Sequence, residues 1–305
     1  MSDDAEQEAD DGEADGAADE GGKEAAGVSD EEDENGKGTA GGEDETETAA
    51  ASASISPEKL ADYDYLIQNF YTVDSSTTIS SAQLNASELL QIDCSVAEGG
   101  GEEPQILIYH THASEGYSDS TEGDYSTTVV GVGEELAGIL RDTYGYTVLH
   151  DTGVYDSDRN RAYSVAKPYI EQILAEHPSI EVVIDLHRDG VSSDTRLVTE
   201  QDGVSVAQVM FFNGLSRTTS LGDISYLENP YITENLAFSL QMKLAAEELY
   251  PGFSRKIYLK GYRYNMHLMP KSLLVEVGAQ TNTLEEAMNA MGPLAAVLDR
   301  VLSGE

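Results

Sequence analysis

Five short, mostly apolar runs set the architecture of this 305-residue chain. Runs of three or four such side chains are typical of strands that are buried on both faces of a sheet. They fall at 106–109, 146–149, 182–184, 209–212 and 273–275. Stretches with helical spacing alternate with them, at 128–143, 160–176 and 231–249. The alternation predicts an α/β fold with a twisted mixed or mostly parallel sheet of about five to six strands and helices on both faces.

The C-terminal segment carries its own signals for the start and the interruption of a helix. Thr283 is followed three residues later by Glu286, which is the spacing of a capping box, so a final helix should begin there. Gly292-Pro293 should kink or split that helix, because proline cannot donate a backbone hydrogen bond inside it.

The first fifty residues contain 20 Asp and Glu against 2 Lys, with glycine and alanine filling most of the rest. Such a segment has almost no apolar surface to bury, so we expect residues 1–56 to form a disordered acidic tail. Residues 57–103 bring the first aromatic cluster and end in a linker rich in glycine and glutamate. We therefore expect a lead-in segment at 57–103 and the main domain at 104–305.

Composition excludes several classes of protein. The formal net charge is −40, from 17 Lys and Arg against 57 Asp and Glu. This acidity argues against binding to nucleic acid and disfavours electrostatic binding to anionic membranes. The single cysteine, Cys94, allows no intramolecular disulfide and no thiolate cluster, and we expect it to fill apolar space. No run of 18 apolar residues and no export signal is visible in the chain.

Three of the predicted strands end in residues that can bind a metal ion. The first is followed by His112 and Glu115, the third by His187, and the fifth by Glu276. Ligands gather at the carboxyl ends of strands in sheets of this type, so these side chains can meet at one edge. Catalytic zinc is typically held by three His or carboxylate ligands, and a further carboxylate acts as general base. We predict His112, Glu115 and His187 as zinc ligands and Glu276 as the base.

Other polar residues near these strand ends are secondary candidates. His110 is the rival for the third ligand position, since period-two alternation would place it on the face of His112 if the strand continued. Arg188 and Arg263 are candidates for binding a substrate carboxylate or a developing oxyanion, although Arg188 could instead pair with a neighbouring aspartate. Asp185 and Asp189 could orient His187 from behind the metal.

Four sequence motifs together resemble the stage II sporulation protein P family. They are His-Thr-His-Ala-Ser-Glu at 110–115, Asp-Leu-His-Arg-Asp at 185–189, Tyr-Arg-Tyr-Asn at 262–265, and Leu-Val-Glu-Val-Gly-Ala at 274–279 with Asn-Thr-Leu-Glu-Glu-Ala at 282–287. The resemblance runs from about Tyr63 to the C-terminus. It implies a peptidoglycan amidase and endopeptidase of engulfment, with a zinc amidase-like or carboxypeptidase-like fold, and it supports His112, His187 and Glu276.

The resemblance extends to location and partners. It implies an extracytoplasmic, membrane-associated enzyme with peptidoglycan as substrate and the stage II sporulation proteins D and M as possible partners, although no anchor is visible here. The wider zinc N-acetylmuramoyl-L-alanine amidases take a ligand from a glutamate early in their first helix. The corresponding stretch at 126–130 has none, which leaves Glu115 and His110 as the alternatives.

Two other functions fit parts of the pattern. His-x-x-Glu followed far downstream by His is also the ligand pattern of zinc carboxypeptidases, which release amino acids from peptide ends. A non-catalytic wall-binding module is the third hypothesis, and the retained His112, His187 and Glu276 argue against it.

Overall fold

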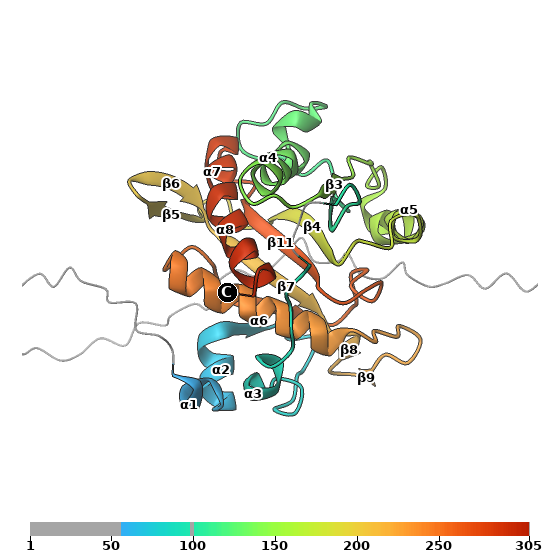
Figure 1. The fold of residues 1–305 in the computed structure, drawn as a ribbon, viewed down its shortest axis with the longest axis vertical. Helices are drawn as coiled ribbons and strands as arrows, with labels where there is room; N and C mark the ends of the chain where they lie inside the picture. The colour runs from blue at the N-terminus through green and yellow to red at the C-terminus, as the bar shows by residue number, and fades with distance from the viewer. Residues whose placement is uncertain (1–55, 98–100, 305) are drawn as a thin grey trace, which may run out of the picture.

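A computed structural model describes residues 56–97 and 101–304. Its centre is a seven-stranded sheet in the order β1-β10-β7-β11-β4-β2-β3 (Figure 1). The strands are β1 (Tyr71–Val73), β2 (Ile106–Tyr109), β3 (Val148–His150), β4 (Val182–Asp189), β7 (Val209–Gly214), β10 (Ile257–Lys260) and β11 (Ser272–Ala279). Two separate hairpins project from it: β5 (Val198–Gln201) with β6 (Val204–Ala207), and β8 (Arg217–Thr218) with β9 (Gly222–Asp223).

The sheet consists of two parallel blocks that run in opposite directions. Strands β11, β4, β2 and β3 are mutually parallel, as are β1, β10 and β7. The blocks join where β7 pairs antiparallel with β11. The predicted α/β fold with a mixed, mostly parallel sheet is confirmed, with seven strands in place of about five to six. The additional members, β1 and β10, are short strands toward one edge of the sheet, and burial alternates along β10, so neither is fully buried on both faces.

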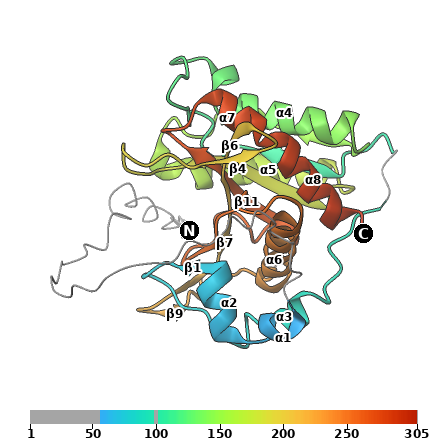
Figure 2. The same cartoon turned by 90° about the vertical axis from the view of Figure 1, so that its left-hand side faces the viewer.

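Helices cover both faces of the sheet (Figures 1 and 2). Helices α4 (Val129–Asp142), α6 (Ile232–Leu249) and α8 (Met291–Leu302) pack on the face that presents Ile106 and Ile108 of β2. Helix α5 (Ala162–Glu176) packs on the other face through Ala166 and Ile170, against Leu107 and Tyr109. Successive residues of β2 therefore point to opposite layers, as the pleat requires.

The C-terminal helix is split, as predicted. Helix α7 (Leu284–Asn289) begins with the Thr283–Glu286 capping box, in which each side chain accepts the other residue's backbone N–H. Helix α8 starts at Met291, directly after Ala290. Pro293 thus lies in the first turn of α8, where a missing backbone donor costs no internal hydrogen bond.

The segment before residue 98 packs on the same hydrophobic core as the rest of the chain. It contains α1 (Pro57–Leu60), α2 (Tyr63–Phe70), β1 and α3 (Ala86–Leu89). Strand β1 forms the edge of the main sheet by pairing with β10. Cys94 is buried, and burial raises the pKa of its thiol to about 11, as fits an apolar filler.

The predicted acidic tail lies, apart from Ser56, outside the described residues. Among the residues that are described, no helix is both long and apolar enough to cross a bilayer.

Candidate metal centre

The centre of the site is a cross-strand pair. In the parallel pairing of β4 with β11, His187 stands opposite Glu276, and Asp185 stands opposite Leu274. Residues two apart in a strand share a face, so Asp185, His187 and Glu276 lie on the same side of the sheet. This is the face that carries Tyr109, because Tyr109 of β2 is the register partner of Asp185.

The turn after β2 brings in the other two candidate ligands. The backbone N–H of Glu115 donates to the carbonyl of His112 at 3.1 Å, which closes a tight turn and places both side chains toward β4. His112, Glu115 and His187 then offer ligand atoms that all lie within 4.8 Å of one another, and all three residues are buried. The three predicted zinc ligands are therefore brought together in space.

The carboxylate of Glu115 is held by cations and by one backbone donor. Its Oε2 accepts from the backbone N–H of Arg188 at 3.1 Å and lies 3.2 Å from Nδ1 of His187. Its Oε1 accepts from Arg159 at 2.9 Å. Burial alone would raise the pKa of Glu115, but His187 and Arg188 hold it well below its usual range. Glu115 is thus ionised, which is the form that ligates a metal ion.

Asp185 stands behind His187. Its Oδ1 lies 2.8 Å from Nε2 of His187, and its two oxygens accept from the backbone N–H and the hydroxyl of Thr111 at 2.9 and 2.6 Å. Burial lowers the pKa of His187, but the carboxylates of Asp185 and Glu115 outweigh burial and raise it well above the ordinary value. A position between two buried carboxylates favours positive charge, which a bound metal ion would supply in place of the proton on the imidazole. Asp189, the other candidate for this role, instead pairs with Arg255.

Three buried polar atoms of these residues have no hydrogen-bond partner: Nε2 of His112, Nε2 of His187, which contacts Asp185 only as an ion pair, and Oε2 of Glu276. Burying such atoms without a partner is costly, so they point to a ligand or to a catalytic role. Burial also lowers the pKa of His112 to about 4, which keeps its imidazole neutral and able to bind a metal. Two imidazoles and one carboxylate form a donor set that suits zinc. The residues present therefore fit a zinc ion.

His110, the rival ligand, lies outside this group. The alternation along β2 directs His110 to the face covered by α4. There its Nδ1 donates to the carbonyl of Leu186 at 2.9 Å, and its Nε2 lies 2.9 Å from Nε2 of His150. Gly133 of α4 packs against both rings, since a Cβ at that position would lie 2.6 Å from Cε1 of His110.

The predicted arginines occupy different surroundings. Arg188 follows His187 and donates through Nε to the carbonyl of Gly116 at 3.0 Å and through Nη1 to the carbonyl of Asp189 at 3.3 Å. Neither Asp185 nor Asp189 forms an ion pair with it among the described contacts. Arg263 lies in the loop after β10 and donates to the carbonyl of Glu228 at 3.4 Å. The two guanidinium groups are thus bound mainly to backbone carbonyls.

Sequence reasoning missed two residues that border the site. Tyr163, at the start of α5, presents its ring edge-on to His112 at 5.6 Å and stacks on His187 at 6.5 Å, both measured between ring centroids. Arg159 belongs to the short helix η2 (Arg159–Arg161) and reaches Glu115. Neither residue belongs to one of the four sequence motifs. Both reach the site from the connection between β3 and α5 or from the first turn of α5.

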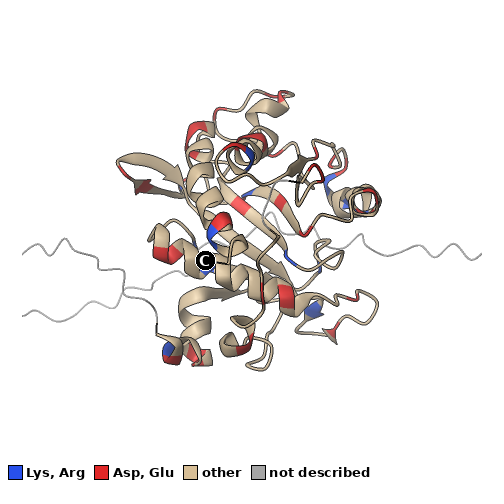
Figure 3. Cartoon of the chain, in the orientation of Figure 1, with Lys and Arg blue, Asp and Glu red and all other residues tan. Residues whose placement is uncertain are grey.

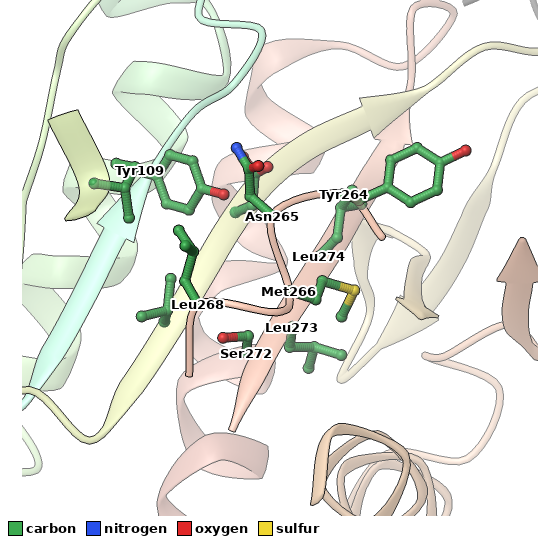
Figure 4. A pocket seen from close by; sticks show the side chains of 11 residues that line it. Tyr109, Tyr264, Asn265, Met266, Leu268, Ser272, Leu273 and Leu274 are labelled. Carbon is green, nitrogen blue, oxygen red and sulfur yellow. The ribbon is translucent and has the colours of Figure 1, made fainter. Parts of the chain in front are cut away.

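A small, mostly apolar pocket lies beside Asp185, between β2, β4, β11 and the loop after β10 (Figure 4). Tyr109, Asn265 and Leu268 border it in the close-up. Tyr264 of the same loop packs edge-on against Tyr163 at 5.2 Å. The Tyr-Arg-Tyr-Asn motif thus approaches the candidate metal ligands through the aromatic contact of Tyr264 with Tyr163. Arg263 of the same motif donates to the backbone carbonyl of Glu228.

Acidic residues outnumber basic residues over the described part of the chain. Figure 3 shows acidic positions spread over most elements and fewer basic ones. Arg159 and Arg188, which both approach Glu115, therefore stand out as positive charges beside a buried carboxylate.

A mixed α/β sheet with a buried His–Glu–His group, and a further glutamate on the neighbouring strand, defines a protein with a candidate single-metal site. Comparison with known sequences makes the assignment specific. The chain belongs to the Stage II sporulation protein P family, whose family model matches residues 6–299.

One curated relative is the Stage II sporulation protein P of Bacillus subtilis (strain 168). It is 25% identical over 221 residues, which cover 66% of this chain and 52% of that protein. The chain thus spans about half the length of this relative.

Similar solved structures include two amidases. The CwlD amidase from Clostridioides difficile, solved in complex with the GerS lipoprotein, has a TM-score of 0.42 at 12% identity and covers 66% of this chain and 100% of that one. The N-acetylmuramyl-L-alanine amidase Ami1 from Mycobacterium smegmatis has a TM-score of 0.41 at 12% identity, covering 68% of this chain and 100% of that one.

Proposed function

We propose that this protein is a zinc-dependent peptidoglycan hydrolase, an N-acetylmuramoyl-L-alanine amidase that acts in sporulation engulfment. The observation that carries the proposal is the meeting of His112, Glu115 and His187 within 4.8 Å, beside the cross-strand partner Glu276. Membership of the Stage II sporulation protein P family supports sporulation as the setting. Peptidoglycan as substrate implies an extracytoplasmic location, where the stage II sporulation proteins D and M are candidate partners.

The chain's own residues account for binding and proton transfer. His112, Glu115 and His187 would hold the zinc ion, and Asp185 would fix the orientation of His187. When bound, zinc supplies a Lewis acid that polarises an acyl oxygen and lowers the pKa of water. Glu276 would accept a proton from the attacking water and deliver it to the leaving amide nitrogen. Burial raises the pKa of its carboxyl group to about 8, within the range that suits a group that both takes and gives a proton near neutral pH.

Turnover of purified peptidoglycan by the full chain tests this proposal. The products should be glycan strands and free stem peptides with an N-terminal alanine, and chelation followed by zinc should abolish and restore their release. Glu276→Gln should lower turnover by about 10²–10⁴-fold while one zinc per chain stays bound. Glu171→Gln, at an exposed position of α5, serves as the matched control.

Each alternative function predicts a different outcome of the same peptidoglycan assay. Unchanged turnover in Glu276→Gln with zinc bound would show that the assigned base is wrong. Single amino acids released from peptide ends would identify a carboxypeptidase, and cleaved cross-links an endopeptidase. Wall binding without any release, in a protein that has no affinity for zinc, would identify a binding module.

A further inference from the structure

Tyr163, in the first turn of α5, holds its ring against two of the candidate metal ligands. The ring meets the imidazole of His112 edge-on, at an interplanar angle of 78°, and lies nearly parallel to that of His187, at 17°. Nε2 of His112 and Oε2 of Glu276 are buried atoms of the same site that have no hydrogen-bond partner. The phenol therefore borders the place where the candidate ligands and the candidate base converge.

The hydroxyl of Tyr163 is an unpaired donor in this site. No group in the described part of the chain forms a hydrogen bond with it, and it is not among the unpaired polar atoms that are fully buried, so it is accessible to a ligand. Burial raises the pKa of the hydroxyl well above its ordinary value, and the carboxylates of Asp185 and Glu276 add to this effect. The hydroxyl thus lies within electrostatic reach of the sheet face that carries both carboxylates.

The Tyr-Arg-Tyr-Asn motif of the loop after β10 fixes Tyr163 in this position. Nδ2 of Asn265 donates to the backbone carbonyl of Tyr163 at 2.9 Å, and the ring of Tyr264 packs edge-on against that of Tyr163. Both motif residues have a left-handed backbone, with φ values of 49° for Tyr264 and 54° for Asn265. Such a conformation is uncommon for a tyrosine and persists only where the surrounding structure imposes it. The loop is thus held in the conformation that anchors the start of α5.

We propose that Tyr163 is a catalytic residue whose hydroxyl donates a hydrogen bond to the acyl oxygen of the scissile amide, and that Asn265 is a positioning residue that acts through Tyr163. This inference rests on the proposed function and adds two residues to its site. As the oxygen of water bonds to the acyl carbon, electrons of the C=O double bond move to the acyl oxygen, and its negative charge strengthens the hydrogen bond. The phenol keeps its proton. These electrons return as the C–N bond breaks, and the leaving nitrogen takes its proton from Glu276.

The test measures kcat and KM of the zinc-loaded full chain on a synthetic N-acetylmuramoyl peptide. Tyr163→Phe keeps the ring and removes only the hydroxyl. The lost hydrogen bond is strongest in the transition state, so kcat should fall by roughly 10–100-fold while KM and bound zinc stay unchanged. Tyr169→Phe is the matched control, because it removes a hydroxyl from an exposed position of the same helix and should keep the wild-type kcat.

A double-mutant cycle tests the role of Asn265. Asn265→Gly suits the left-handed backbone and removes the donor to Tyr163, so it should lower kcat in the wild-type background. In the Tyr163→Phe background it should have little further effect, because the hydroxyl that it positions is already absent. A fall in kcat that adds fully to that of Tyr163→Phe would overturn the positioning role.

Binding of a phosphinate analogue of the same peptide provides a readout without turnover. The analogue presents a negatively charged tetrahedral oxygen in place of the acyl oxygen. Calorimetry should show that Tyr163→Phe weakens its binding by roughly 10–100-fold, whereas Tyr169→Phe binds it as the wild type does. The uncleaved peptide should bind Glu276→Gln equally well with and without the hydroxyl of Tyr163.

Failure of the inference differs from failure of the proposed function. Unchanged turnover and analogue binding in Tyr163→Phe would overturn the catalytic role of Tyr163 and leave the proposed function standing. Loss of bound zinc in Tyr163→Phe would show that the residue serves the metal group, which also overturns the catalytic role. If the zinc-loaded wild type neither cleaves the peptide nor binds the analogue, the proposed function fails, and this inference fails with it.

Discussion

Asp185 Oδ1 lies 2.8 Å from Nε2 of His187, and both side chains are nearly inaccessible to solvent. The two residues are neighbours on one face of β4, because side chains two apart in a strand point the same way. Thr111 fixes the carboxylate by donating two hydrogen bonds to it. The imidazole is thus oriented by its own strand and by the turn that carries the other candidate ligands.

Replacing Asp185 by asparagine should weaken zinc binding by about 10–100-fold, because the substitution removes the charged partner that orients His187. Competition with a chromophoric chelator measures the dissociation constant, and circular dichroism checks that the fold is kept. Asp189→Asn is the matched control, since Asp189 pairs with Arg255 and not with His187. Equal zinc affinities for Asp185→Asn and the wild type would show that Asp185 does not support the metal.

Gly133→Ala should destabilise the protein by about 1–3 kcal/mol, because overpacking forces well-packed neighbours to move. A Cβ there would lie 2.6 Å from Cε1 of His110 and 2.9 Å from Nε2 of His150. Gly138→Ala on the same helix meets nothing within 4 Å and should stabilise the protein by about 0.5–1 kcal/mol. Chemical denaturation of both variants measures the difference, and a Gly133→Ala variant as stable as Gly138→Ala would contradict this packing.

A fragment of residues 104–305 should fail to fold stably, whereas residues 56–305 should unfold cooperatively. The shorter fragment lacks strand β1 and the buried side chains of Leu66, Phe70, Leu84 and Leu89. Each such side chain contributes about 1.5–3 kcal/mol, and together they are comparable to the whole stability of a typical domain. Thermal unfolding followed by circular dichroism separates the two fragments. A cooperative transition in 104–305 at the same temperature would contradict the prediction.

Acid should destabilise the fold partly through His110. Burial lowers the pKa of this residue from 6.5 to about 3, so the folded chain keeps the imidazole neutral while the unfolded chain takes up a proton. Unfolding therefore binds a proton between these pH values, and the unfolding free energy falls as pH decreases. The contribution approaches about 1.4 kcal/mol per pH unit between pH 6 and 5. Urea denaturation of His110→Gln should show a correspondingly smaller pH dependence, and an unchanged dependence would contradict this assignment.

Most of the strands that sequence could predict are buried on both faces, and the edge strand β3 is the exception. Ile106–Tyr109, Val182–Asp189 and Val209–Gly214 contain continuous apolar runs, and each forms a strand near the predicted position. Strands β1 and β10 escaped prediction because they lie toward one edge of the sheet, where fewer positions need apolar side chains. The reversal of direction between β7 and β11 also leaves no sequence signal, since it depends on how distant strands pair.

The candidate ligands could be predicted because each lies near or just beyond the C-terminal end of a strand, and parallel strands in one block end at the same edge. The separation of His110 from His112 could not, because it depends on β2 ending at Tyr109 and on the turn that follows. Arg159 and Tyr163 could not be predicted either. They reach the site through a long connection whose path is determined by tertiary packing, including the contact of Asp156 with Ser114.

His187 and Glu276 face each other as a cross-strand pair of β4 and β11. This pairing determines where the chain can accept insertions and deletions. Both groups sit inside neighbouring strands, so their spacing depends on backbone hydrogen bonding and hardly at all on the length of chain between them. Insertions in the loops between residues 190 and 271, outside β7, α6 and β10, should leave that spacing intact. Adding or removing one residue inside β4 or β11, by contrast, turns a side chain to the opposite face of the sheet.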